Sequence, residues 1–176
     1  ESRQLMEKLY GKGQAEAGIS RYQKLIKGYE AIFGNEEIAL FTSPGRTEIS
    51  GNHTDHNHGK VLAGSINLDC VGAAAKTDDR KVHIVSETYH QDFIIDLDDL
   101  SPSPKLAGTV DLTKGLLKGF LEQGSQIGGF HAYITSNVIS AAGVSSSAAY
   151  EMLLCAILNT FFNEGKLDIV AYAHAG

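Results

Sequence analysis

The chain has 176 residues, 43% of them hydrophobic and 20% charged, which is the size and composition of one globular domain. Its formal net charge of −6 excludes a general nucleic-acid binder, because phosphate backbones require clustered Lys and Arg. No apolar run approaches the roughly 20 residues that cross a bilayer. Cys70 and Cys155 follow no metal-ligand spacing. We therefore expect a cytoplasmic protein with free thiols and with neither a nucleic-acid nor a membrane partner.

Helical and strand periodicities alternate along the chain, which predicts an α+β protein. Apolar residues recur at helical spacing from Ile19 to Phe33, and Gly34 follows where a helix usually ends. By the same criterion, helices are predicted at 19–33, 112–121 and 146–162, and from 167 onward. Apolar runs between polar connections predict strands at 38–43, 81–86, 92–97 and 130–138, with one or two more within 60–76.

The segment 44–59, PGRTEISGNHTDHNHG, is far more polar than the runs on either side of it. It opens with Pro44-Gly45, which predicts a turn. Its histidines are His53, His56 and His58. With Asp55 they are of the types that bind zinc. A structural loop closed by Asn and Asp side chains is a second interpretation. A third is sugar binding, in which charged groups accept hydrogen bonds from vicinal hydroxyls. Composition alone does not rank sugar above metal.

A second informative segment is 137–159, NVISAAGVSSSAAYEMLLCAILN. A predicted strand ends, small residues follow, and three serines open a long apolar helix. Small side chains let backbone N–H groups approach a phosphate, and the helix N-terminus attracts an anion. The simpler alternative is a serine N-cap that needs no ligand. No Gly-Lys-Ser/Thr follows the glycine, so the segment is not a Walker A loop.

Both segments resemble known kinase motifs. PGRTEISGNHTDHNHGKVL resembles the galactokinase signature, in which Gly-Arg is followed by Gly, an acidic residue, His-x-Asp and Asn. AAGVSSSAAYE resembles the phosphate loop of the GHMP kinases (galactokinase, homoserine kinase, mevalonate kinase and phosphomevalonate kinase). The two motifs come in the family's order and at about its spacing. The resemblance implies the GHMP N-terminal fold, a mixed sheet with helices and a left-handed βαβ crossover. It also implies that residues 1–176 are the N-terminal sugar- and ATP-binding domain of a galactokinase-like protein, with the C-terminal domain absent from this chain.

The resemblance assigns roles to matching residues. Arg46 is the implied catalytic residue, beside the reacting hydroxyl and the transferred phosphate. The implied substrate-binding residues are Asn52, His53 and Asp55. The implied ATP phosphate-binding residues are Gly143, Val144, Ser145, Ser146 and Ser147. Ser146 is also the implied Mg²⁺ ligand, together with a Glu expected beyond the chain end.

The implied activity is transfer of the ATP γ-phosphate to the anomeric hydroxyl of galactose, with ATP and Mg²⁺ as cofactors. Asn52 stands where galactokinases usually carry a Glu that binds the C6 hydroxyl. A kinase for galacturonate or an amino sugar is therefore an alternative, and a non-catalytic galactokinase-like sugar sensor is another. In the family, the catalytic Asp and an acidic Mg²⁺ ligand follow the segment matched here. We therefore expect the 176-residue chain alone to be inactive.

Overall fold

The computed structural model of the chain describes residues 2–50, 60, 62–104, 108–138 and 145–168. Helices and strands alternate irregularly along these ranges. In chain order they are α1 (Ser2–Tyr10), α2 (Ala15–Phe33), β1 (Ala39–Ser50), β2 (Leu62–Lys76), β3 (Lys81–Ser86), β4 (Gln91–Asp96), α3 (Gly108–Glu122), β5 (Phe130–Ser136) and α4 (Ser146–Phe162).

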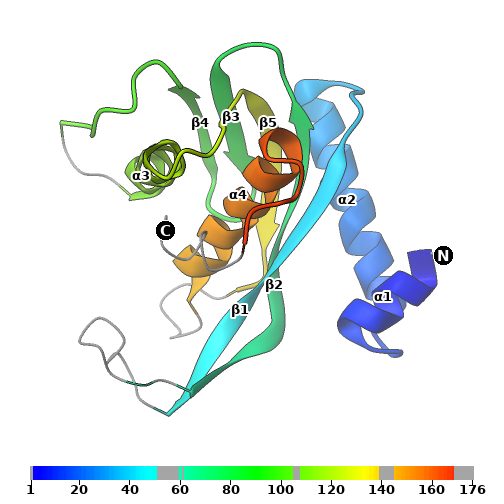
Figure 1. Ribbon diagram of the computed structural model, residues 1–176. Coiled ribbons are helices and arrows are strands. Elements are labelled where there is room, and N and C mark those ends of the chain that lie inside the picture. Colours follow the sequence, from blue (N-terminus) through cyan, green and yellow to red (C-terminus); the bar gives the residue numbers. More distant parts are fainter. Residues whose placement is uncertain (1, 51–59, 61, 105–107, 139–144, 169–176) are drawn as a thin grey trace.

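The strands form one mixed sheet in the order β1-β2-β5-β3-β4. Neighbouring strands are antiparallel except β3 and β5, which run parallel. Between these two strands the chain forms the outer strand β4 and then α3. Helices α3 and α4 cover one face of the sheet, and α1 and α2 cover the other (Figure 1). The predicted α+β class with a mixed sheet is confirmed, while the left hand of the crossover stays a prediction.

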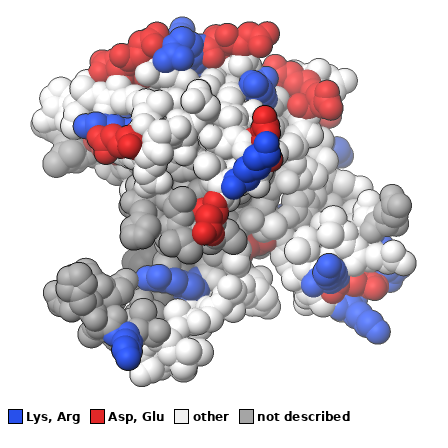
Figure 2. Space-filling model, in the orientation of Figure 1, with Lys and Arg blue, Asp and Glu red and all other residues white. Residues whose placement is uncertain are grey.

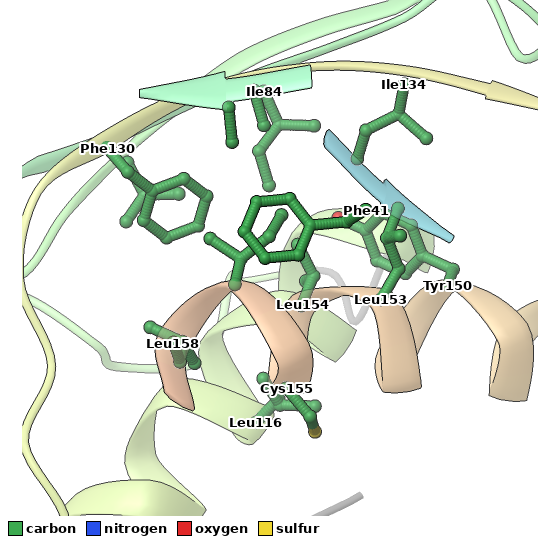
Figure 3. Packing of buried hydrophobic residues seen from close by; sticks show 14 of the residues in the cluster. Phe41, Ile84, Leu116, Phe130, Ile134, Tyr150, Leu153, Leu154, Cys155 and Leu158 are labelled. Atoms are coloured by element: carbon green, nitrogen blue, oxygen red, sulfur yellow. The ribbon is translucent and has the colours of Figure 1, made fainter. Parts of the chain in front are cut away.

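The larger core lies between the sheet and helices α3 and α4 (Figure 3). Leu153 and Leu154 of α4 point toward the strands, where they meet Phe41 of β1 and Ile134 of β5. Leu116 reaches the same core from α3. Helix α4 buries side chains along most of its length, which explains why the segment 146–162 is so apolar.

Strand β2 is covered on both faces, which explains its run of small apolar residues. Cys70 and Ala74 face the core under α4, whereas Val71, Ala73 and Ala75 face the core under α2. A strand buried on both sides loses the alternation that identifies a half-exposed strand, which is why the sequence pattern predicts one or two strands here without deciding between them. It is a single strand of 15 residues.

The hairpin of β1 and β2 extends past the rest of the sheet (Figure 1). Strand β5 pairs with β2 only as far as Ser136 opposite Cys70, whereas β1 and β2 continue to pair beyond this point. The pairing shifts after Pro44, because the step from 69 to 65 in β2 lies opposite the step from 44 to 46 in β1. The turn predicted at Pro44-Gly45 is therefore wrong. Proline lacks an N–H, and an edge strand such as β1 accommodates it.

Other differences are local. Helix α1 was not predicted, although Leu5, Met6 and Leu9 have helical spacing. The predicted helix from 167 onward does not include Leu167 or Asp168, and its remaining positions lie outside the described residues. Strand β5 ends at Ser136, two residues earlier than predicted.

Candidate active site

Helix α4 begins at the serines of the second motif. Ser145 occupies the N-cap position, with left-handed backbone angles of φ 55° and ψ 56°. Its side chain makes no capping hydrogen bond, and the first turn of α4 carries no acidic residue. The N-cap interpretation therefore does not account for Ser145. A non-glycine residue in the left-handed region carries a conformational cost, which is found most often at functional sites.

The Ser145 hydroxyl contacts the other motif instead. Arg46 Nε donates a hydrogen bond of 3.1 Å to Ser145 Oγ. Arg46 lies on β1 beyond the bulge, and Ser145 is 99 positions further along the chain. The guanidinium thus stands at the helix N-terminus, where the backbone N–H groups also attract negative charge. On the face shown in Figure 2, cationic side chains lie over the hairpin.

A pocket of about 200 Å³ adjoins the first turn of α4. Its lining residues are Ile84, Ser86, Tyr89, Gln91, Phe93, Thr109, Leu112, Ser146, Ser147 and Tyr150. The aromatic and aliphatic members provide flat apolar walls. Burial raises the pKa of Tyr150, whose hydroxyl lies 2.8 Å from Thr113 Oγ1. Tyr150 therefore stays neutral at physiological pH and contributes no charge to the pocket.

Two polar groups of this pocket lack a hydrogen-bond partner. Within the part of the chain that the structure describes, Ser86 Oγ and Gln91 Oε1 are buried and unpaired. An unpaired buried polar atom costs roughly 1–3 kcal/mol, so such atoms indicate a missing partner. Sequence reasoning missed both residues. The only signal was a serine at the end of one strand and a glutamine at the start of the next, which is too common to identify a site.

The structure describes only part of the predicted site. Arg46 and Ser145 are brought together, and Ser146 and Ser147 line the adjoining pocket. The remaining predicted residues, Asn52, His53, Asp55, Gly143 and Val144, lie outside the described residues. His56 and His58 of the zinc interpretation also lie outside them. Within the described ranges, no group of three or more His, Cys, Asp or Glu side chains is arranged to hold a metal ion.

The sequence and the fold of this chain both resemble those of known proteins. Residues 27–76 match the model of the galactokinase galactose-binding signature. The chain is 34% identical over 147 residues to a galactokinase of Clostridium tetani and 36% identical over 157 residues to one of Lactobacillus helveticus. The crystal structure of Lactococcus lactis galactokinase complexed with galactose superposes with a TM-score of 0.80 at 28% identity, covering 88% of this chain.

The chain belongs to the galactokinase family.

The match covers the N-terminal portion of galactokinases. This family member spans 37% of the length of the Clostridium tetani protein, 40% of the Lactobacillus helveticus protein and 40% of the Lactococcus lactis structure. The mevalonate kinase of Methanococcus jannaschii shares the fold alone, with a TM-score of 0.66 at 15% identity over 80% of this chain and 45% of that one. The GHMP-kinase N-terminal fold predicted for the galactokinase-like chain is therefore confirmed. No helix among the described residues is long and apolar enough to cross a membrane.

Proposed function

We propose that residues 1–176 are the N-terminal sugar- and ATP-binding domain of a sugar kinase. This kinase transfers the γ-phosphate of ATP to the anomeric hydroxyl of galactose and releases galactose 1-phosphate. The observation that carries the proposal is the 3.1 Å hydrogen bond between Arg46 and Ser145. It joins the segment that carries the sugar signature to the segment that begins with the phosphate-binding loop. Transfer between two substrates requires such adjacency of their binding sites.

The sugar half of the proposal rests on the polar sequence that follows Ser50. Asn52, His53 and Asp55 fall within the matched galactose-binding signature, which covers residues 27–76. Carboxylate, amide and imidazole groups hydrogen-bond sugar hydroxyls, and the carboxylate accepts most strongly because it is charged. The similar Lactococcus lactis structure is a complex with galactose. Galactose is therefore the first sugar to test.

The phosphate half rests on the N-terminus of α4. Ser145 leaves the first backbone N–H groups of α4 without a side-chain cap, and Arg46 adds a cation beside them. We assign the ATP phosphates to this position, with Gly143, Val144 and the serines 145–147 around them. The Ser146 hydroxyl is an oxygen ligand of the kind Mg²⁺ accepts, and bound Mg²⁺ spreads the charge of the phosphate oxygens. Arg46 would stabilise the charge that develops on the transferred group.

The nucleobase is assigned to the pocket beside α4. The pocket opens next to Ser146 and Ser147, and its apolar walls suit a flat heterocycle. The unpaired Ser86 Oγ and Gln91 Oε1 supply a hydroxyl and an amide oxygen, which can bond the polar edge of a base. An adenine amino group would donate to Gln91 Oε1 and remove its desolvation cost.

Calorimetry on the 176-residue chain tests the binding half of the proposal. Titrations use galactose, 6-deoxygalactose, galacturonate, ADP and ATP with Mg²⁺. We expect galactose and the adenine nucleotides to bind, and Gln91→Ala to weaken ADP without changing galactose. The Asn52→Glu chain, compared with the wild type, reports selectivity at C6, because a carboxylate there would repel galacturonate. Absence of binding by every sugar and nucleotide would overturn the proposal.

Turnover is measured on a protein of the relatives' length that carries this sequence as its N-terminal portion, called here the family-length protein. An ATPase-coupled assay with the same sugars separates the alternatives. Preferred turnover of galacturonate identifies the related-sugar kinase. Binding of galactose and ATP without turnover identifies the sugar sensor.

A further inference from the structure

Asp69 of β2 is a buried carboxylate at the point where pairing between β2 and β5 ends. Its side chain is only 6% exposed. A charge in this position is strongly disfavoured unless cations and hydrogen-bond donors surround it. The structure supplies them from three other elements. Arg21 of α2 forms an ion pair with Oδ1, Tyr10 of α1 donates to Oδ2 at 2.5 Å, and Thr42 of β1 donates to Oδ2 at 2.6 Å.

The backbone carbonyl of Asp69 is held as well. Arg21 donates to it through its second guanidinium nitrogen at 3.0 Å, and the backbone N–H of Asn137 donates to it at 3.0 Å. Asn137 directly follows β5. Asp69 thus accepts bonds from both helices on its face of the sheet, from strand β1 and from the residue that follows β5.

The location of Asp69 links this cluster to the active site. Asp69 lies opposite Pro44, the last register position before the bulge, and next to Cys70, where pairing with β5 ends. Beyond it the β1–β2 hairpin continues without a third strand and carries Arg46. Thr42 is four residues before Arg46, and Asn137 is two residues before the segment 139–144 that leads to Ser145. Asp69 is therefore bonded to a residue that shortly precedes Arg46 and to one that precedes Ser145 in the sequence.

On the face of the sheet that carries the Asp69 side chain, packing beside the cluster is incomplete. A pocket of about 310 Å³ lies beside the cluster, lined by Tyr10, Gln14, Ala17, Gly18, Arg21, Asn67, Leu68 and Asn137. The hollow between the hairpin and helices α1 and α2 is visible in the lower part of Figure 2. Beside this open space, the bonds to Asp69 add to the apolar contacts that connect the sheet to α1 and α2.

We propose that Asp69, fixed by Arg21, is a positioning residue that sets the hairpin carrying Arg46 in register with Ser145 at the start of α4. This role rests on the proposed function, because it matters for catalysis only if these segments hold sugar and phosphate. The Thr42 bond links the Asp69 carboxylate to the strand that carries Arg46, and the Asn137 bond links the Asp69 carbonyl to the chain that precedes Ser145. Arg21 controls both, since it bonds the carboxylate and the carbonyl together.

The first test needs no ligand. Backbone amide NMR spectra of the 176-residue chain are compared for Arg21→Met and Thr42→Val. We expect Arg21→Met to shift the amides of residues 45–47 and 145–147, and Thr42→Val to shift those of 45–47 alone. Shifts confined to the neighbours of the substituted residue, with both ranges unmoved, would overturn the proposal. Thr42→Val changes no charge and little volume, so it decides the matter even if Arg21→Met does not fold.

Matched controls break the same kinds of bond elsewhere. Arg80→Met removes an exposed Arg–Asp pair with Asp98, and Thr77→Val removes a Thr–Asp bond of 2.7 Å to Asp79 at the far end of β2. Neither should shift residues 45–47 or 145–147. If either control shifts them as strongly as Thr42→Val does, the cluster at Asp69 has no special role.

The second test measures binding by calorimetry. Thr42→Val should raise the galactose Kd roughly tenfold, the factor that corresponds to one hydrogen bond to a charged group, and leave the ADP Kd unchanged. Arg21→Met should raise both, and Arg21→Lys should recover part of the loss. Equal weakening of both ligands by Thr42→Val would mean general destabilisation and overturn the proposal. Failure of the wild type to bind either ligand refutes the proposed function instead, while the NMR comparison still decides the positioning role.

Discussion

Replacing Arg46 by Ala should slow the chemical step while leaving the fold almost unchanged. The Arg46 side chain is exposed, and its 3.1 Å bond to Ser145 lies at the surface. Exposed polar contacts contribute roughly 0–1 kcal/mol to folding, so we expect the melting temperature to fall by at most about 4 °C.

The effect on turnover should be much larger. A charged hydrogen bond to a group that gains charge in the transition state is worth about 1.5–3 kcal/mol, which corresponds to a loss in kcat of roughly tenfold to 150-fold. Because Arg46 is assigned to the transition state and not to ground-state sugar binding, KM should change little. Asp55→Ala should show the opposite pattern, with KM raised. Both variants are measured in the family-length protein by the ATPase-coupled assay, with thermal unfolding recorded in parallel.

Arg80→Ala is the matched control for Arg46→Ala. Arg80 is also exposed and donates through Nε, to Asp98 Oδ1 at 2.7 Å, but it lies outside the proposed site. It should show the same small change in melting temperature and an unchanged kcat. The reasoning is refuted if Arg46→Ala raises KM at constant kcat, or if it unfolds the protein and so loses activity through stability alone.

Two further predictions concern stability. Gly28→Ala should destabilise the fold by about 1–3 kcal/mol, because its new Cβ would lie 2.4 Å from Cε1 of the Tyr133 ring. Gly115→Ala should instead stabilise the fold by about 0.5–1 kcal/mol, because a Cβ at this helical position would have no neighbour within 4 Å. Equal effects of the two substitutions in urea unfolding would contradict this prediction. Burial raises the pKa of Cys70 and of Cys155 from 9.0 to about 12. The folded state therefore disfavours the thiolates, so the free energy of unfolding should decline as the pH rises from 9.0 to about 12. The decline should be at most about 1.4 kcal/mol per pH unit for each thiol. An unfolding midpoint that does not change across this pH range would refute the prediction.

Local patterns predicted the regular elements well. Helix α4 has the predicted bounds of 146–162, and strand β3 the predicted bounds of 81–86, because periodicity and end signals are contained in each segment. Proline misled the prediction at residue 44, since the turn signal is local whereas tolerance of proline depends on the strand being at the sheet edge. Such an effect appears only after strand order is known.

The residues of the candidate site were likewise predicted only in part. The motif resemblance predicted that Arg46 and Ser145 belong to one site, and the structure brings their side chains together. Asp69, Ser86 and Gln91 escaped notice because their significance arises from register and burial. Nothing in the residues around Asp69 shows that β5 stops pairing beside it, or that Arg21, 48 positions earlier, reaches its carboxylate.

The position of the transferred phosphate tests the central claim most directly. The family-length protein is incubated with galactose, ATP and Mg²⁺, and the phosphorylated sugar is identified by phosphorus and proton NMR. If the motifs around Arg46 and Ser145 form one sugar-kinase site, the product is galactose 1-phosphate, and Arg46→Ala forms it roughly tenfold to 150-fold more slowly. Phosphate on another hydroxyl, or no transfer by a protein that binds both galactose and ATP, would contradict the account.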